Sequence, residues 1–243
     1  MGKFIDGLKL GIYQTFILNN NYQYFISGVG ITLLVTIFAL VLGLVIGVVI
    51  AIVRSAHDQQ PVNKRGIFLN LTNAICQIYL TVIRGTPMMV QLLIMWFVIW
   101  ASARASTGNM VRCAILAFGI NSGAYIAEIV RSGIMSIDKG QMEAGRSLGL
   151  NYATTMQHII IPQAFKNILP ALGNELITLL KETSIVTVIG LKDLTKGAMI
   201  IQAKTYQAFV PFFAIAAIYL VMVLFLSWLM GKLERRLRQS DLR

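Results

Sequence analysis

Two long apolar runs that contain no charged residue constrain the fold most strongly. Residues 26–53 and 205–231 include no Asp, Glu, Lys or Arg. As helices, these runs would each be roughly 40 Å long, enough to cross a ~30 Å hydrocarbon core with some tilt. Only 13% of the chain is charged and 56% is hydrophobic, whereas soluble domains usually carry about a quarter charged residues. The sequence therefore predicts an all-α integral membrane protein.

The net charge of +11 does not indicate nucleic-acid binding, because the basic residues lie between the apolar runs and in a tail rather than on a soluble face. The tail, residues 232–243, reads KLERRLRQSDLR. In a membrane protein this pattern is typical of cytoplasmic loops and tails, which follow the positive-inside bias and are attracted to anionic lipid.

Hydropathy predicts about five membrane spans, at residues 26–53, 72–102, 110–133, 163–185 and 207–231. Residues 1–25 are expected to form an N-terminal interfacial or extracytoplasmic segment. The second span contains the sequence RGTP, from Arg84 to Pro87, which predicts a kink. Two separate spans are the alternative for residues 67–103.

Five spans place the two termini on opposite sides of the membrane. Positive charges predict a cytoplasmic C-terminus and an external N-terminus, since they occupy the first loop (Arg54, Lys64, Arg65), the segment 131–158 (Arg131, Lys139, Arg146) and the tail (Lys232, Arg235, Arg236, Arg238, Arg243). One outer region runs against this assignment, because it carries Lys181, Lys192, Lys196 and Lys204. The other loops and the tail favour the five-span topology.

A polar loop, residues 136–162, separates the third and fourth spans. Asp138 followed by Gln141 is a capping-box arrangement for a short helix over 139–148. Gly149 then supplies a left-handed stop, and Asn151 caps a second helix that leads to Pro162. The loop is therefore predicted to be ordered.

One face of the helix 139–148 is expected to carry Gln141, Ala144, Gly145 and Leu148, with Glu143 and Arg146 beside it. The alternative, a helix resting on lipid, would carry bulky apolar residues and lysines on opposite faces. This helix has neither feature, and its small side chains favour close docking into a groove of another protein.

The loop resembles the EAA loop of ABC-importer permeases, E-A-A-x3-G-x9-I-x-L-P. Both spacings of that pattern are kept here by Glu143, Ala144, Gly145, Gly149, Ile159, Ile161 and Pro162. Gly145 stands in place of the third alanine, and Ile161 in place of leucine. Outside the loop, VIRGTPMMVQL (82–92), SGAYIAEIVRSGI (122–134) and LGNELITLLKETSIVTVIGLKDL (172–194) resemble the polar amino-acid branch, which covers histidine, glutamate, glutamine, arginine and opine importers.

The resemblance implies an ABC transporter type-1 transmembrane domain over residues 26–231 in a bacterial cytoplasmic membrane. It implies coupling to an ATPase subunit dimer through Glu143, Ala144, Gly145, Arg146, Leu148 and Gly149. Further implied partners are a second permease subunit, identical or homologous, and an extracytoplasmic amino-acid-binding protein. ATP and Mg²⁺ would be bound by the ATPase, since the chain lacks a G-x-x-x-x-G-K-[ST] stretch.

Polar residues in the apolar segments are candidates for a substrate path. Glu175 is the foremost, because a mid-span carboxylate must face protein or a water-filled cavity; it would contact a permeating amino acid or pair structurally between helices. Glu128 either joins the path or pairs with Arg131 three residues on. The weaker candidates are Asn174, Gln91, Asn121 and Thr183.

No catalytic constellation or metal site is predicted. Cys76 and Cys113 lie singly in apolar segments and are interpreted as small hydrophobic residues, while His57 and His158 are interpreted as solvated. An ion-gradient transporter or channel is the main rival function, but internal repeats and a series of intramembrane charges are not apparent. A membrane scaffold that recruits a soluble partner and a membrane enzyme are the other rivals.

Overall fold

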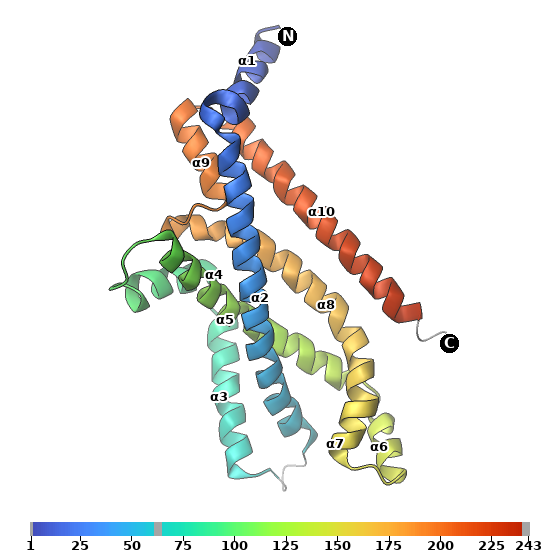
Figure 1. Cartoon of the computed structure of the whole chain (residues 1–243). Helices are drawn as coiled ribbons and strands as arrows, with labels where there is room; N and C mark the ends of the chain where they lie inside the picture. Colours follow the sequence, from blue (N-terminus) through green and yellow to red (C-terminus); the bar gives the residue numbers. More distant parts are fainter. Residues whose placement is uncertain (1, 61–64, 240–243) are drawn as a thin grey trace. The chain divides into compact units, whose positions relative to one another are not determined.

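The computed structural model describes residues 2–60 and 65–239, and the regular structure of these ranges is helical (Figure 1). Within them, four helices are long and apolar enough to cross a membrane: α2 (Tyr22–Gln59), α3 (Ile67–Arg84), α5 (Thr107–Met135) and α10 (Phe209–Gln239). The shorter or more polar helices are α1 (Gly2–Ile12), α4 (Met88–Ile94), α6 (Lys139–Ser147), α7 (Tyr152–Thr155), α8 (Ile161–Glu182) and α9 (Leu194–Thr205).

The chain divides into two compact units. Unit 1 contains residues 1–39, 88–118 and 178–226, and unit 2 contains residues 40–87, 119–177 and 227–243. Helices α2, α5, α8 and α10 contribute residues to both units, whereas α3, α6 and α7 belong to unit 2 alone.

In unit 2, α2 and α5 approach closely through glycines spaced four residues apart, Gly43 and Gly47 in α2 and Gly119 and Gly123 in α5. A Cβ atom at Gly47 would lie 2.6 Å from Ile126 Cγ2 and 2.9 Å from a backbone nitrogen of α5. Small residues at this spacing let membrane helices pack backbone against backbone, where dispersion contacts replace the missing hydrophobic drive. The α2–α5 contact is therefore the tight centre of unit 2.

Other helices of unit 2 pack around this pair. Leu80 of α3 is buried against Ala124 and Ala127 of α5, and α3 runs beside the second half of α2 (Figure 1). Ala164 and Ile168 of α8 join a cluster with residues of α2 and α5. Unit 2 is thus held by apolar contacts among four helices.

In unit 1, α9 begins at a buried cap. The Asp193 carboxylate accepts hydrogen bonds from the backbone N–H groups of Thr195, at 3.1 Å, and Lys196, at 2.9 Å. Burial raises the pKa of Asp193, while these bonds lower it. The helix that follows packs into a core cluster composed of Phe25, Leu194, Ala198, Ile201 and Ile215. The cap satisfies N–H groups that would otherwise be buried without a partner.

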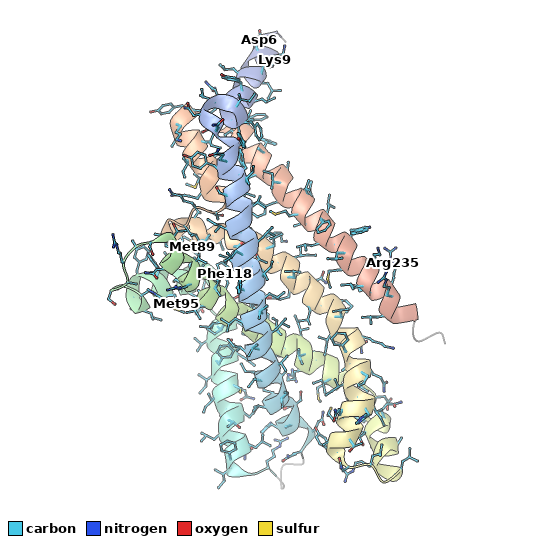
Figure 2. The ribbon with its side chains drawn as sticks, in the orientation of Figure 1. Asp6, Lys9, Met89, Met95, Phe118 and Arg235 are labelled. Carbon is cyan, nitrogen blue, oxygen red and sulfur yellow. The ribbon has the colours of Figure 1, made fainter. Side chains whose placement is uncertain are left out.

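Unit 1 also contains α1, on which Asp6 and Lys9 are labelled in Figure 2, and α4, on which Met89 is labelled. Phe118 of α5 is fully buried, whereas Met89 of α4 is exposed. On α1, Asp6 and Lys9 are exposed, and so are the apolar side chains of Leu10 and Ile12. This mixed surface agrees with the sequence pattern, and the interfacial placement of residues 1–25 stays a prediction.

The helix bounds can be compared with the predicted spans. The spans 26–53 and 110–133 lie inside α2 and α5, and the span 207–231 lies in α10 except for its first two residues, since α10 begins at Phe209. The span 163–185 overlaps α8, which ends at Glu182 and is less apolar than the four candidate membrane helices. Which helices cross the bilayer stays a prediction, as do the external N-terminus and the cytoplasmic C-terminus. Of the basic residues on which that topology was based, Lys64, Arg243 and the side chain of Arg238 lie outside the described residues.

The predicted span 72–102 is divided between two helices. α3 ends at Arg84, the Gly85 N–H donates to the Thr81 carbonyl at 2.9 Å, and α4 begins at Met88. Pro87 lacks an N–H group and disfavours a helical conformation at the residue before it, so the sequence RGTP ends the helix instead of bending it.

The α2–α5 contact predicts opposite effects for two glycines of α2. Gly47→Ala should destabilise the protein by about 1–3 kcal/mol, because the added methyl group overpacks the contact. Gly30→Ala, the matched control, meets open space and should be neutral or stabilising by up to about 1 kcal/mol through helix propensity. Thermal unfolding in detergent measures both variants, and equal melting temperatures would contradict the proposed close contact.

Candidate functional site

The polar loop folds as its sequence predicts. α6 covers Lys139–Ser147, and the Asp138 carboxylate accepts a hydrogen bond of 2.6 Å from the Gly140 N–H. Gly149 has a φ of 83°, a left-handed conformation that glycine adopts without steric cost. The Asn151 side chain then accepts from the Thr154 N–H at 2.8 Å and caps α7. Local capping rules are enough to build this loop.

α6 and α7 lie side by side (Figure 1), and Gly145 makes their contact possible. A Cβ at Gly145 would lie 2.5 Å from Thr155 Cγ2. Gly145 is buried, so it is not on the exposed docking face where the helical pattern placed it with Gln141 and Ala144. The reason is that α7 already occupies that side of α6.

Among the exposed residues of α6 and its C-terminal cap are Gln141, Glu143, Ala144, Arg146 and Leu148. Leu148, at the C-terminal cap, is 80% exposed. An apolar side chain flanked by a carboxylate and a guanidinium forms a compact surface suited to a protein partner.

A cavity of about 380 Å³ lies behind this surface. Its wall is formed by the ends of α2 and α5 together with α6, α7 and the turn after α7, and it includes Asp58, Ile137, Met142, Glu143 and Arg146. The Tyr152 hydroxyl donates to Gln59 Oε1 at 2.6 Å and so joins α7 to α2. Burial raises the pKa of Tyr152.

Four charged side chains join α2 to α5 close to the cavity. Arg54 Nη1 lies 2.6 Å from Glu128 Oε1, and Arg131 Nη2 lies 3.0 Å from Glu128 Oε2. Arg131 Nη1 also lies 3.2 Å from Asp58 Oδ2. The side chains are only 15–28% exposed, so breaking the network would leave a partly buried charge without compensation.

The network explains Glu128 more fully than the sequence did. The predicted pair with Arg131 is present, but Glu128 also binds Arg54, 74 residues earlier in the chain. Both of its carboxylate oxygens have cationic partners in the structure. A substrate role for Glu128 stays a prediction.

Glu175 lies in α8 and accepts a hydrogen bond of 2.7 Å from the Ser122 hydroxyl of α5. Ser122 is buried, and Glu175 is partly buried. Sequence reasoning missed Ser122, although it begins the motif SGAYIAEIVRSGI; its spacing from Glu128 gave no sign that it would face α8. The hydrogen bond joins α5 to α8.

The remaining candidates are divided between the two units. Asn174, Asn121 and Glu175 belong to unit 2, whereas Gln91 and Thr183 belong to unit 1. The Thr183 hydroxyl donates to the Leu180 carbonyl at 2.7 Å, which satisfies it within its own helix end. Asn121 is buried and Asn174 is exposed. A path role for each of these residues stays a prediction.

The two histidines differ in their surroundings. His158 is exposed, and its Nδ1 lies 3.1 Å from the Thr154 carbonyl oxygen. His57 is 15% exposed and its Nδ1 lies 3.4 Å from Asp58 Oδ1, so it is less exposed to solvent than His158. Within residues 2–60 and 65–239, no group of three His, Cys, Asp or Glu side chains is arranged to hold a metal ion.

The long apolar helices and the ordered polar loop between α5 and α8 are typical of a multi-pass membrane protein. Residues 67–239 match the family described as binding-protein-dependent transport system inner membrane component. The chain belongs to this family. It is a transport permease of an ABC importer, whose ATPase is a separate subunit, and not an enzyme.

Curated relatives agree with this assignment. The arginine transport system permease protein ArtQ of Bacillus subtilis (strain 168) is 40% identical over 188 residues, which cover 72% of this chain and 85% of ArtQ. The glutamine transport system permease protein GlnP of Escherichia coli (strain K12) is 38% identical over 168 residues, or 69% of this chain and 77% of GlnP.

Solved structures share the fold. A crystal structure of an amino acid ABC transporter with histidines has a TM-score of 0.77 and 43% sequence identity, and the match covers 88% of this chain and 94% of that chain. The MetNI methionine ABC transporter in an inward-facing conformation has a TM-score of 0.71 at 19% identity, over 89% of this chain and 97% of that chain.

The cap of α6 gives a prediction about the loop. Asp138→Ala should cost about 1 kcal/mol of local helix stability and speed amide exchange in α6 roughly fivefold. Asp138→Asn, the matched control, keeps an oxygen that accepts from the Gly140 N–H and should exchange as the parent does. Hydrogen–deuterium exchange over residues 140–147 measures the difference. If the alanine variant exchanges like the parent, the cap does not hold α6 in place.

Proposed function

We propose that the chain is the permease subunit of an ATP-driven importer that moves a polar amino acid across the cytoplasmic membrane by alternating access. The observation that carries the proposal is the ordered α6 loop with EAA spacing, which presents Glu143, Arg146 and Leu148 to solvent. Support for the substrate class comes from relatives named as arginine and glutamine permeases and from a similar amino acid ABC transporter.

The proposed assembly contains an ATPase subunit dimer, a second permease subunit and an extracytoplasmic amino-acid-binding protein. ATP and Mg²⁺ would be held by the ATPase, and this chain would bind no cofactor. The basic tail, which includes the exposed Arg235 of α10 (Figure 2), supports a cytoplasmic C-terminus. With α8 and α10 as the fourth and fifth spans, α6 would then lie on the same cytoplasmic side as the tail, where the ATPase is available.

Coupling would begin where α6 contacts the ATPase. Glu143, Ala144, Arg146 and Leu148 would make the contact, while Gly145 would let α6 move together with α7 and Gly149 would set the turn between them. α7 is bonded to the end of α2 through Tyr152 and Gln59. A displacement of α6 would therefore reach α2 through packed and hydrogen-bonded groups instead of through a loose loop.

Glu175 is the proposed substrate contact. Its carboxylate accepts a hydrogen bond from Ser122, and its negative charge would complement the ammonium or guanidinium group of a permeating amino acid. Asn174, Asn121, Gln91, Thr183 and Glu128 would contribute polar groups elsewhere along the path.

Charge reversal on α6 tests coupling. Glu143→Arg should reduce amino-acid-stimulated ATP hydrolysis by about tenfold or more, because it places a like or unmatched charge at the contact with the ATPase. The assay uses the purified permease–ATPase complex in proteoliposomes with a panel of amino acids and binding proteins. Glu234→Arg in α10 makes the same charge change away from α6 and should keep stimulation. Solute flux that follows an ion gradient and needs no ATPase would refute the importer.

Glu175 gives a test of substrate recognition. Glu175→Gln keeps an acceptor for Ser122 but loses the charge, so apparent affinity for cationic amino acids should fall about tenfold or more. Neutral amino acids should be affected less. Ser122→Ala, which leaves the carboxylate in place, is the control, and stimulation curves across the panel provide the readout. Equal loss for all amino acids would indicate a structural hydrogen bond between α5 and α8 instead.

A further inference from the structure

α3 has one packed face and two exposed faces of different chemistry. The packed face includes Asn73 and Leu80, which are buried. On one exposed face, apolar side chains follow the helical spacing and are 54–88% exposed: Ile67, Leu71, Ile75, Ile78 and Val82. This face resembles the lipid-exposed surfaces of the other long helices.

The second exposed face is polar. Asn70, Gln77, Thr81 and Arg84 are exposed, and Ala74 lies between the first two. At 3.6 residues per turn, this face points about 120° away from the apolar exposed face. Gln77 is close to the middle of α3, so the polar face is not limited to the helix ends.

A polar face of this kind is not suited to lipid. The most apolar window of α3 has a mean hydropathy of 1.3, compared with 3.1 for α2 and 2.7 for α10. Amide and guanidinium groups in the hydrocarbon region are expensive unless they face protein or water. Since the apolar face of α3 already provides a surface for lipid, the polar face requires a different neighbour.

Water suits this face better than another helix does. Close helix contact in this protein uses glycine, as α2 and α5 show. The polar face of α3 has no glycine, and the long side chains of Gln77 and Arg84 at its middle and its end hold a second backbone away there. At its end, the Arg84 guanidinium lies 5.5 Å from the ring centre of Tyr125 in α5. Tyr125 is itself 39% exposed, so the polar surface continues from α3 onto α5.

We propose that Asn70, Gln77, Thr81 and Arg84 line a water-filled passage through which the polar substrate crosses the membrane. The proposal rests on the transport function proposed above and adds a wall of the passage that neither Glu175 nor α6 provides. The amide and hydroxyl groups would exchange hydrogen bonds with a hydrated zwitterion, while Arg84 would favour its carboxylate near one end.

Thiol accessibility in the reconstituted permease–ATPase complex tests the passage. Cys76→Ala and Cys113→Ala first remove the native thiols. Gln77→Cys and Ile78→Cys are then compared, because the two positions have nearly the same depth in α3 but belong to its polar and apolar faces. A membrane-impermeant methanethiosulfonate should modify Gln77→Cys at least about tenfold faster, since the reactive thiolate forms only where water reaches. Thr81→Cys replaces Gln77→Cys if the latter does not assemble.

Rates are measured without nucleotide and in an ATP-trapped state, and basal ATP hydrolysis verifies assembly. Faster modification on the polar face in either state supports the passage. Equal, slow modification of both faces in every state overturns it, and so does disulfide cross-linking of Gln77→Cys between permease subunits, which would identify a subunit interface. If amino acids stimulate ATP hydrolysis but the thiol reagent does not reach the polar face of α3, the passage is refuted and the proposed transport function is not. If the reagent reaches the polar face but no amino acid stimulates ATP hydrolysis, the proposed substrate class is refuted.

Discussion

The close contact between α2 and α5 is the interaction on which the arrangement of unit 2 depends. Glycines on both helices remove the side chains that would hold the backbones apart. Because the helices approach so closely, Arg54 reaches Glu128 and Asp58 reaches Arg131 farther along the same pair. A larger separation would leave these charges partly buried without partners, so the apolar contact and the ion pairs require each other.

The bilayer explains where the polar groups lie. In hydrocarbon, every backbone N–H and C=O must be satisfied internally, which leaves helices as the regular structure of this chain. Polar side chains then occupy three kinds of position. Some bond to their own helix, as Thr183 does with the Leu180 carbonyl; some pair between helices, as Ser122 does with Glu175. Others, such as Gln77, remain exposed on a face separate from the apolar one.

Local features could be predicted from the sequence, and distant pairings could not. Asp138, Gly149 and Asn151 act within three residues of their own positions, so capping and turn preferences were sufficient to place them. The ion-pair partners of Glu128 were harder to predict from the sequence. Its i, i+3 neighbour was evident, but Arg54 lies 74 residues away and depends on the register of α2 against α5. The same reason concealed Ser122, because nothing local indicates which side of α5 faces α8.

Gly145 shows how a family pattern can be recognised while its physical role is misjudged. The helical pattern alone assigned this small residue to the docking face, yet the structure buries it against Thr155. Under the proposed function, this contact makes α6 and α7 move as one piece. The hydrogen bond from Tyr152 to Gln59 then joins that piece to α2, where Asp58 and Arg54 are bound to α5. Each link is a packed or hydrogen-bonded contact, so under the proposed function a displacement of α6 would pass through them to α2 and α5.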